Sequence, residues 1–351
     1  MRFFLNKIIL EDLKEIFDDK IIKWENFRNK SFLITGAYGM LASYMTWMLI
    51  YLNEFENYNI KIYALGRSLD NFRNRFGKFC EKDYFKIINQ DINKELDSFS
   101  SENLDYIIHA ASKASSQYYG IDPVGVIKPN VLGTINTLEL AKEKNVSAYL
   151  FFSSGEIYGA ITKPLILESD SGYLDPMHFR SCYAESKRLG ETLCACYRHQ
   201  YGINTKVVRP SHTYGPTLDL INDSRVFSQF ISNIVKKEDI VLKSDGSAIR
   251  NFCYISDATR AYFKILLDGE GAYNVSGTPE CRISIRNLAE LLSKKYNLNV
   301  ITQERTLNNS YIENVHKEHS QLSIDKLLNL GWKCNYGIES GFERTIKSFT
   351  E

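Results

Sequence analysis

Short apolar runs alternate with longer stretches of helical periodicity along the first half of the chain. The apolar runs are typical of strands buried on both faces of a parallel sheet. They are Phe32–Ile34, Ile60–Leu65, Phe85–Ile92, Leu104–Ser112 and Tyr149–Ser154. Between them, Met40–Leu52 and Asp122–Lys144 have the apolar spacing of helices. This alternation predicts an α/β fold with a doubly wound parallel sheet.

The two ends of the chain follow a different pattern. Before the first strand, apolar residues recur at near-helical spacing and predict one or two amphipathic helices that pack on the domain edge; they are Ile8, Ile9, Leu13, Ile16, Phe17 and Ile21. Beyond about residue 210 the alternation loosens into longer loops. We therefore expect a helical extension over residues 1–30, a dinucleotide-binding domain over 31–210 and a smaller substrate-binding lobe over 211–351, interleaved with the domain before it.

The segment Thr35–Ala42 connects the first strand to the first long helix and contains two glycines. Gly36 suits a tight turn, Gly39 lets the backbone approach a ligand, and Ala42 is small enough for the helix to pack on the strand. A pyrophosphate would then lie at the helix N-terminus. Because a glycine pattern alone is a weak signal, an ordinary strand–helix turn is the alternative.

The ends of the next strands also suit a dinucleotide. The second strand ends at Gly66 without an acidic residue, and the neighbouring Arg67 favours NADP over NAD because an arginine can hold a 2′-phosphate. Asp91 and Ile92 end the third strand, beside the expected adenine site. The fourth strand ends in small residues that leave room for a cofactor, Ala110, Ala111 and Ser112.

Composition excludes several classes of protein. The 351 residues carry 43 Lys and Arg against 42 Asp and Glu, so charge gives no reason to expect nucleic acid or a membrane as partner. No apolar run approaches the roughly 20 residues of a membrane span. Acidic residues before residue 20 do not fit a leader peptide. The seven cysteines are scattered without metal-ligand spacing. We expect a soluble cytoplasmic protein with reduced thiols and no metal.

The strongest chemical signal follows the fifth strand. Tyr183 and Lys187 are four residues apart, so on a helix they share one face. A nearby lysine cation lowers the pKa of a phenol and favours the phenolate, which can take the proton of a sugar hydroxyl while hydride leaves the same carbon. Ser154 can hydrogen-bond to that oxygen. Alone, the Tyr/Lys spacing would indicate only an amphipathic helix; with the glycine turn and the serine-rich strand end, it predicts an oxidoreductase site.

At this point the chain resembles the extended short-chain dehydrogenases/reductases of the NAD-dependent epimerase/dehydratase group, which act on nucleotide sugars. The resemblance covers roughly residues 30–345 and implies a Rossmann-type fold with tightly bound NAD or NADP. Besides the segments above, it rests on Asn130 with Gly133-Thr134, Arg209-Pro210, Tyr214-Gly215-Pro216, Arg250-Asn251-Phe252, Tyr273-Asn274-Val275 and Leu330-Gly331-Trp332. It places the cofactor against Gly36, Tyr38, Gly39, Met40, Arg67, Asp91, Ile92, Ala110, Ala111, Ser112, Asn130, Tyr183 and Lys187.

Within the group, the sequence looks most like UDP-glucuronate decarboxylases. The resemblance makes Tyr183 the base for a C4 hydroxyl, Lys187 the group that adjusts its pKa and Ser154 the hydroxyl partner, while Glu156 acts as acid or base at C5. Oxidation at C4 would labilise a C6 carboxylate. The implied substrate-binding residues are Lys113, Tyr119, Ser154, Glu156, Arg225 and Arg250. The resemblance also implies a homodimer formed through two long helices.

Position 155 departs from the family pattern. Gly155 stands where dehydratases have aspartate and decarboxylases have serine, which disfavours dehydration and leaves both epimerisation and decarboxylation open. We expect the glycine to open space beside C5 and C6. Two further functions remain: an NADPH-dependent 4-keto-sugar reductase, which Arg67 favours, and a silent nucleotide-binding regulatory protein, against which the intact Ser154, Tyr183 and Lys187 argue.

Overall fold

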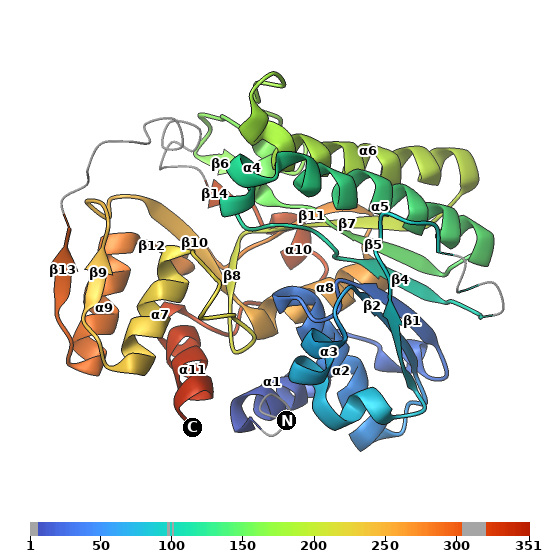
Figure 1. Ribbon diagram of the computed structural model, residues 1–351, viewed down its shortest axis with the longest axis horizontal. Coiled ribbons are helices and arrows are strands. Elements are labelled where there is room, and N and C mark those ends of the chain that lie inside the picture. The colour runs from blue at the N-terminus through green and yellow to red at the C-terminus, as the bar shows by residue number, and fades with distance from the viewer. Residues whose placement is uncertain (1–5, 97–98, 100–101, 304–320) are drawn as a thin grey trace.

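Seven parallel strands form the central sheet of the computed structural model, which describes residues 6–96, 99, 102–303 and 321–351 (Figure 1). The strand order is β11-β7-β5-β4-β1-β2-β3, and each neighbouring pair is parallel. The strands are β1 (Ser31–Thr35), β2 (Lys61–Gly66), β3 (Phe85–Asn89), β4 (Tyr106–His109), β5 (Ala148–Phe152), β7 (Thr205–Pro210) and β11 (Gly271–Val275). The predicted α/β parallel sheet is confirmed.

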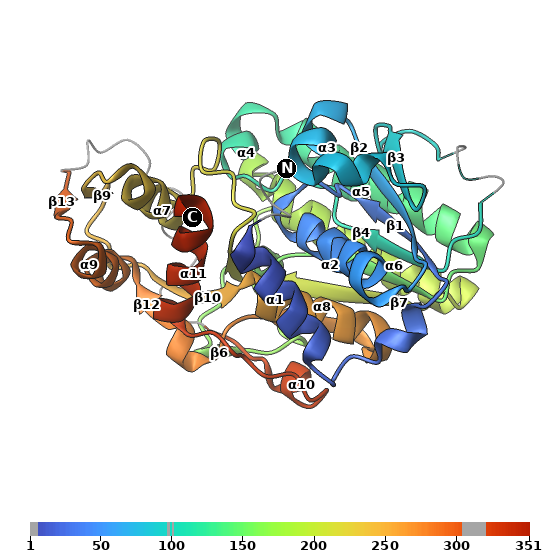
Figure 2. The same cartoon turned by 90° about the horizontal axis from the view of Figure 1, so that it is seen from below.

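Helices cover both faces of this sheet (Figures 1 and 2). Alternate side chains of β1 point to opposite faces: Phe32 and Ile34 join one buried apolar cluster, and Leu33 joins another. The first cluster is completed by α2 (Met40–Glu56), α3 (Leu69–Phe76) and α8 (Ile255–Asp268). The second is completed by α5 (Pro123–Lys144) and α6 (Cys182–Tyr201). The apolar runs are continuous because both of their faces are buried.

Several strands end earlier than the sequence predicts. β3 stops at Asn89, before Asp91 and Ile92, and β4 stops at His109, before the small residues. At the end of β4 the N–H groups of Ala110 and Ala111 donate to the Thr35 hydroxyl, each at 3.1 Å, instead of to a neighbouring strand. At the edge where the candidate site lies, a side-chain hydroxyl thus accepts backbone N–H groups that would otherwise bond to a neighbouring strand. By contrast, α2 extends one turn past the predicted Leu52.

The C-terminal half contributes to a second group of elements, at the left of Figure 1. β8 (His212–Tyr214) and β12 (Arg282–Ser284) flank β10 (Ile249–Tyr254) in a three-stranded sheet, and β9 (Ile240–Leu242) pairs with β13 (Val300–Thr302). The accompanying helices are α7 (Val226–Lys236), α9 (Ile285–Tyr296) and α11 (Ile338–Thr350). The division of the chain near residue 210 stays a prediction, while α8 and β11, from beyond that point, return to the central sheet.

Short elements complete the described chain. β6 (Leu165–Ile166) pairs with β14 (Gln321–Leu322). The short helices are α4 (Gln117–Ile121), α10 (Asp325–Leu328) and the 3₁₀ turns Trp24–Phe27, Gly77–Glu81, Gly155–Tyr158, Phe179–Ser181 and Pro279–Cys281. Within the described residues, no helix combines the length and apolar character needed to cross a membrane.

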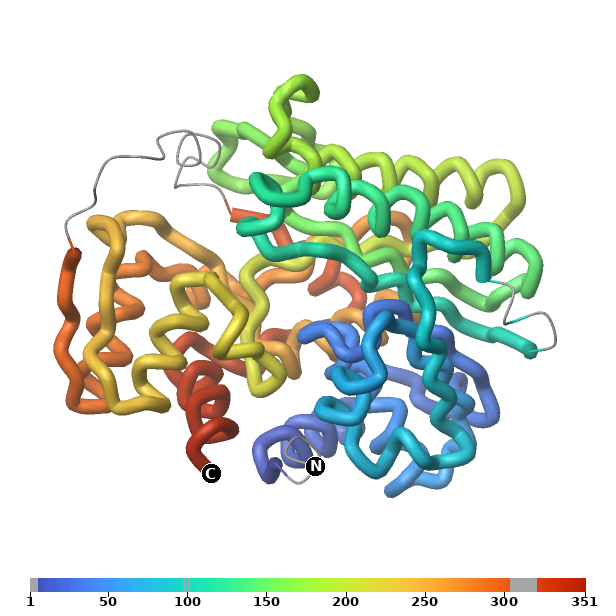
Figure 3. Tube along the Cα trace, viewed as in Figure 1, coloured from blue at the N-terminus to red at the C-terminus, as the bar shows by residue number. Residues whose placement is uncertain are grey.

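One N-terminal helix, α1 (Lys7–Asp18), is tied to both halves of the chain by buried acidic side chains. Asp12 has no exposed surface and accepts hydrogen bonds from Tyr44 of α2, from Tyr254 at 2.6 Å and from Arg344 Nε of α11 at 3.0 Å. Burial raises the pKa of Asp12 to about 6, while Arg344 and the two phenols act in the opposite direction. The trace in Figure 3 shows α1 beside α11.

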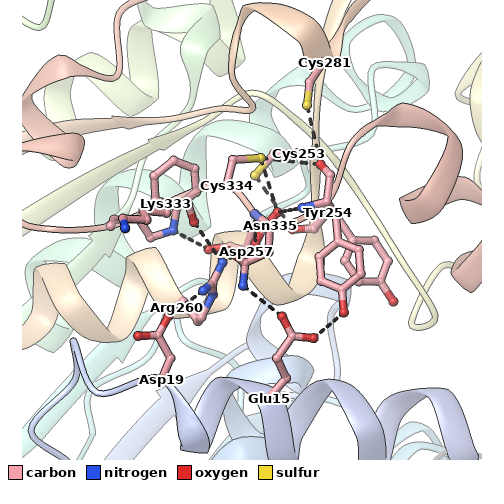
Figure 4. Close-up of polar contacts among 12 residues, drawn as sticks. Glu15, Asp19, Cys253, Tyr254, Asp257, Arg260, Cys281, Lys333, Cys334 and Asn335 are labelled. Carbon is pink, nitrogen blue, oxygen red and sulfur yellow. Dashed lines mark hydrogen bonds and ion pairs between the residues drawn. The ribbon is translucent and has the colours of Figure 1, made fainter.

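Two further acidic contacts follow Asp12, one on α1 and one just after it (Figure 4). Glu15 of α1 accepts a hydrogen bond from the Asn335 amide at 2.9 Å, and Asp19, the residue that follows the helix, binds Arg260 at 2.5 Å. Arg260 is itself paired with the buried Asp257. Three acidic residues thus join the N-terminal segment to elements far away in the sequence.

Asp12→Ala is expected to lower the free energy of unfolding by about 3–5 kcal/mol, because it leaves the two buried phenols without their acceptor and removes the buried carboxylate that pairs with Arg344. Urea denaturation measures this loss. The matched control is Asp18→Ala on the same helix, where the carboxylate is half exposed and pairs with Lys14 at the surface. Similar small losses for both variants would contradict the proposed importance of the buried contact.

Candidate active site

The glycine turn brings the ends of β1 and β4 into direct contact. Gly36 has a φ of +63°, and a Cβ atom there would lie 2.9 Å from the Ala111 Cα. Gly39 precedes α2 as its N-cap, and its N–H donates to the Gly36 carbonyl at 2.8 Å. A Cβ on Gly39 would lie 3.0 Å from that carbonyl. The turn therefore requires glycine at position 36 and places a bare backbone at the positive end of α2, which suits a pyrophosphate.

The residues expected at the adenosine end lie together. The Tyr38 ring covers Gly66, where an added Cβ would be 2.5 Å from the ring, and its hydroxyl accepts the Arg67 N–H at 3.4 Å. Arg67 is exposed. The next strand is adjacent, since Gln90 N–H donates to the Gly66 carbonyl at 3.0 Å, and Asp91 follows directly. Ile92 is buried against Gly133 of α5.

Buried polar atoms without a partner mark the same edge of the sheet. Among the described residues they include the hydroxyls of Ser112 and Ser153, which follow β4 and β5, and the amide oxygen of Asn130 on α5. Buried polar groups are normally satisfied. Together with the glycine turn, these atoms fit a polar dinucleotide ligand. No cluster of three or more metal-binding side chains occurs in the described part of the chain.

Lys187 lies in the interior, one helical turn from Tyr183. Its side chain is 2% exposed, its Nζ donates to the Phe152 carbonyl at 2.6 Å, and it lies 5.8 Å from the centre of the Tyr183 ring. Burial lowers the pKa of Lys187 to about 7, and the Glu191 carboxylate, one turn further along α6, opposes the shift. The predicted pair thus lies on one face of α6, and tertiary packing buries it.

The expected lowering of the Tyr183 pKa is wrong for this structure. Burial raises the pKa of Tyr183 well above its usual value, and the charge of Glu156 adds to the increase. The Ser154 hydroxyl and the Arg225 guanidinium act in the opposite direction without outweighing burial. The reason is desolvation, which penalises the phenolate more than the nearby charges stabilise it.

Glu156 and Tyr119 surround the same phenol. The Ser154 hydroxyl accepts the Glu156 N–H at 3.2 Å and begins the turn Gly155–Tyr158. Burial raises the pKa of Glu156 to about 7, while Arg180 opposes it. The Tyr119 ring stacks on Tyr183, with centres 5.1 Å apart and planes 14° apart. Glu156 is therefore suited to exchange a proton near neutral pH.

Arg180 was missed as a site residue by the sequence reasoning. It belongs to the turn Phe179–Ser181 directly before α6, and its charge acts on both Glu156 and Tyr119. Its position in the sequence, three residues before Tyr183, was the only local sign that its side chain would lie near the site.

The other predicted substrate-binding residues have different partners, and of these residues the charge of Arg225 acts on Tyr183. Lys113 pairs with Asp122 at 2.6 Å, at the start of α5. The Arg225 side chain donates three hydrogen bonds to Asp223, of 2.9 and 3.0 Å from Nε and 2.5 Å from Nη2, and Nη2 also lies 3.4 Å from the Met40 sulfur. A residue of the C-terminal half thus reaches the first residue of α2.

The described contacts of Arg250 and Gly155, unlike those of Arg225, are with strands and not with α2. Arg250 lies on β10, in register with Ile283 of β12, and donates to the Ile249 carbonyl at 2.8 Å. The expected open space beside Gly155 is partly filled, because a Cβ there would lie 3.3 Å from Leu322 Cδ1 and 3.6 Å from the Pro210 carbonyl. Leu322 comes from β14, far away in the sequence, so the pattern around position 155 did not reveal it.

Comparison with known proteins agrees with this geometry. Residues 32–276 match the model of the NAD dependent epimerase/dehydratase family. UDP-glucuronic acid decarboxylase 6 of Arabidopsis thaliana is 34% identical over 72% of this chain and 71% of its own length. UDP-glucuronic acid decarboxylase 1 of Xenopus tropicalis is 28% identical over 91% of this chain and 72% of its own length.

Solved structures share the fold at low sequence identity. UDP-glucose 4-epimerase of Thermotoga maritima is 21% identical, with a TM-score of 0.76 over 91% of this chain and 98% of that one. UDP-glucuronic acid 4-epimerase of Bacillus cereus, in complex with UDP-glucuronic acid and NAD, is 19% identical, with a TM-score of 0.74 over 91% and 98% of the two chains. The chain described here belongs to the NAD dependent epimerase/dehydratase family.

Proposed function

We propose that this protein oxidises C4 of a UDP-linked glucuronate and releases the C6 carboxylate as CO₂. The observation that carries the proposal is the meeting of Tyr183, Lys187, Ser154 and Glu156 beside the glycine turn. The relatives named UDP-glucuronic acid decarboxylase support the choice of substrate.

The side chains divide the proposed reaction between them. Tyr183 takes the proton of the C4 hydroxyl, Ser154 holds the same oxygen, and Lys187 stabilises the phenolate. A bound NAD would accept the hydride from C4 and return it to C4 after CO₂ has left, so that the cofactor is regenerated. The product carries a ketone β to the carboxylate, so the C5–C6 bond breaks with its electrons delocalised onto the C4 oxygen. Glu156, whose pKa is raised to about 7, then delivers a proton to C5.

The diphosphate of the substrate is assigned to Arg225. Its guanidinium carries the planar set of donors that suits a phosphate. Asp223 fixes its Nε and one terminal nitrogen, and the side chain lies between α7 and the start of α2. Lys113, Tyr119, Glu156 and Arg250 remain the other proposed substrate-binding residues.

A second candidate function is an NADPH-dependent 4-keto-sugar reductase, which is favoured by Arg67 at the end of β2. Arg67 is exposed, and the β2 end has no carboxylate. The nicotinamide released on denaturing the purified protein discriminates between the two. Stoichiometric NAD supports the internally recycled reaction, whereas a protein that is purified empty and prefers NADPH supports the reductase.

We also propose a cytoplasmic homodimer that associates through α5 and α6. These helices pack side by side on one face of the sheet (Figure 1). Their outer surface keeps apolar side chains exposed: Val124 is 59%, Leu132 42% and Leu189 44% exposed. All seven cysteines are free thiols, which suits a reducing compartment. Light scattering of the purified protein would give twice the chain mass.

Tyr183→Phe is expected to lower CO₂ release from UDP-glucuronate labelled at its carboxyl carbon by at least about 100-fold, because the proton acceptor at C4 is lost. Bound NAD should remain at the wild-type level. The control is Tyr173→Phe, at a side chain that is 69% exposed. If the wild type releases no CO₂ and forms a C4-epimerised product, the proposed decarboxylation is wrong and the protein is an epimerase.

Lys187→Met is expected to stabilise the cofactor-free protein at pH 6.5 by about 2 kcal/mol or more, because a buried cation is removed. With a folded pKa near 7 against 10.5, the folded wild type binds fewer protons than the unfolded chain between these values, so its stability rises with pH there. The variant lacks that rise. Urea denaturation at pH 6.5 and 9.5 measures both effects, and the surface variant Lys142→Met keeps the wild-type pH dependence.

A further inference from the structure

The buried His109 connects the glycine turn to the helix beside the catalytic residues. It is the last residue of β4 and 1% exposed. Its Nδ1 lies 2.8 Å from the Thr35 hydroxyl, at the end of β1, and its Nε2 lies 3.1 Å from the Thr134 hydroxyl on α5. One imidazole therefore links β1 to α5, which no strand pairing joins.

The direction of each hydrogen bond follows from counting protons. The single hydroxyl proton of Thr134 is donated to the Asn130 carbonyl at 2.6 Å, so Thr134 accepts from His109, and Nε2 carries the imidazole proton. Nδ1 then accepts the hydroxyl proton of Thr35. The lone pairs of Thr35 accept the N–H groups of Ala110 and Ala111, each at 3.1 Å.

A charged imidazole does not fit this arrangement. A proton on Nδ1 would point at a Thr35 oxygen that already accepts two N–H groups. Burial and the nearby Lys187 cation lower the pKa of His109 to about 3, although a hydrogen bond to the Pro129 carbonyl on α5 acts in the opposite direction. The ring is therefore held in one neutral tautomer.

The bonds of Thr35 position the backbone that faces Gly36. Ala111 is the residue whose Cα would lie 2.9 Å from a Cβ on Gly36, and the Ala110 carbonyl would lie 3.2 Å from it. Thr134, the other partner of His109, lies on α5, and α5 is hydrogen-bonded to the catalytic helix α6. The Asn130 amide donates to Ser186 at 2.9 Å, and Ser186 donates to the Tyr183 carbonyl at 2.9 Å.

We propose that His109 is a positioning residue. Its Nε2–H tautomer fixes the Ala110–Ala111 backbone that faces Gly36 at the dinucleotide site and thereby sets the affinity for NAD. The histidine acts through Thr35 and Thr134 and does not itself contact the cofactor. The inference rests on the proposed dinucleotide site. A buried histidine with a purely structural role would affect the stability of the fold but not the affinity for NAD.

Two substitutions separate polarity from shape. His109→Gln keeps an acceptor toward Thr35 and a donor toward Thr134, whereas His109→Phe keeps a ring and loses both. NAD binding to the cofactor-free proteins, measured by calorimetry, should weaken by about 10- to 100-fold for His109→Phe, the cost of leaving buried hydroxyls without partners. His109→Gln should stay within about 3-fold of the wild type.

The control is Tyr149→Phe on the neighbouring strand. It removes another buried hydrogen bond to α5, the one between the Tyr149 and Thr137 hydroxyls at 2.8 Å, and Tyr149 lies beside the His109 ring. It should lower the melting temperature while leaving the affinity for NAD unchanged. An affinity loss for Tyr149→Phe equal to that for His109→Phe would overturn the proposal, because both would then act through stability alone.

A second measurement does not depend on the cofactor. Nitrogen NMR of the histidine-labelled protein, with the His109 signals assigned by their loss in His109→Gln, should show a protonated Nε2 that does not titrate between pH 5 and 9. An Nδ1–H tautomer or a titrating ring would disprove the inference. A wild-type protein that shows this tautomer but binds no NAD would instead contradict the proposed function.

Discussion

The close approach of β1 and β4 at their carboxyl ends is the constraint on which the site depends. Gly36 and Ala111 are so near that no side chain fits between them. This contact leaves a bare backbone at the start of α2, where the helix dipole and free N–H groups favour an anion. Because the strands are parallel, the residues that follow β5 lie at the same edge, and we propose that the catalytic side chains meet the cofactor there.

Burial then determines the electrostatics of the site. Lys187 and Glu156 both have pKa values shifted to about 7 in the directions that favour their neutral forms. The phenol of Tyr183 is shifted the same way. Such burial is destabilising for the fold, but it lets Glu156 and Lys187 exchange a proton more readily near neutral pH than they would in water, whereas the phenol of Tyr183 is held more strongly in its protonated form.

The rest of the chain holds this edge in place. Asp12 of the N-terminal helix binds groups from α2, β10 and α11, and Arg225 extends from the C-terminal half to the start of α2. These contacts join segments that lie far apart in sequence. Residues 6–31, which precede the segment matched by the family, thus contribute directly to how the two halves are joined.

The sequence alone determined the α/β class, the glycine turn and the Tyr183/Lys187 pair, because apolar periodicity and residue spacing act over short distances along the chain. Only the tertiary structure decided the pKa of Tyr183, the filling of the space beside Gly155 by Leu322, and the partners of His109. Each of these depends on residues brought together from distant segments. Desolvation and packing depend on what surrounds a side chain in space, and no local pattern along the chain records that.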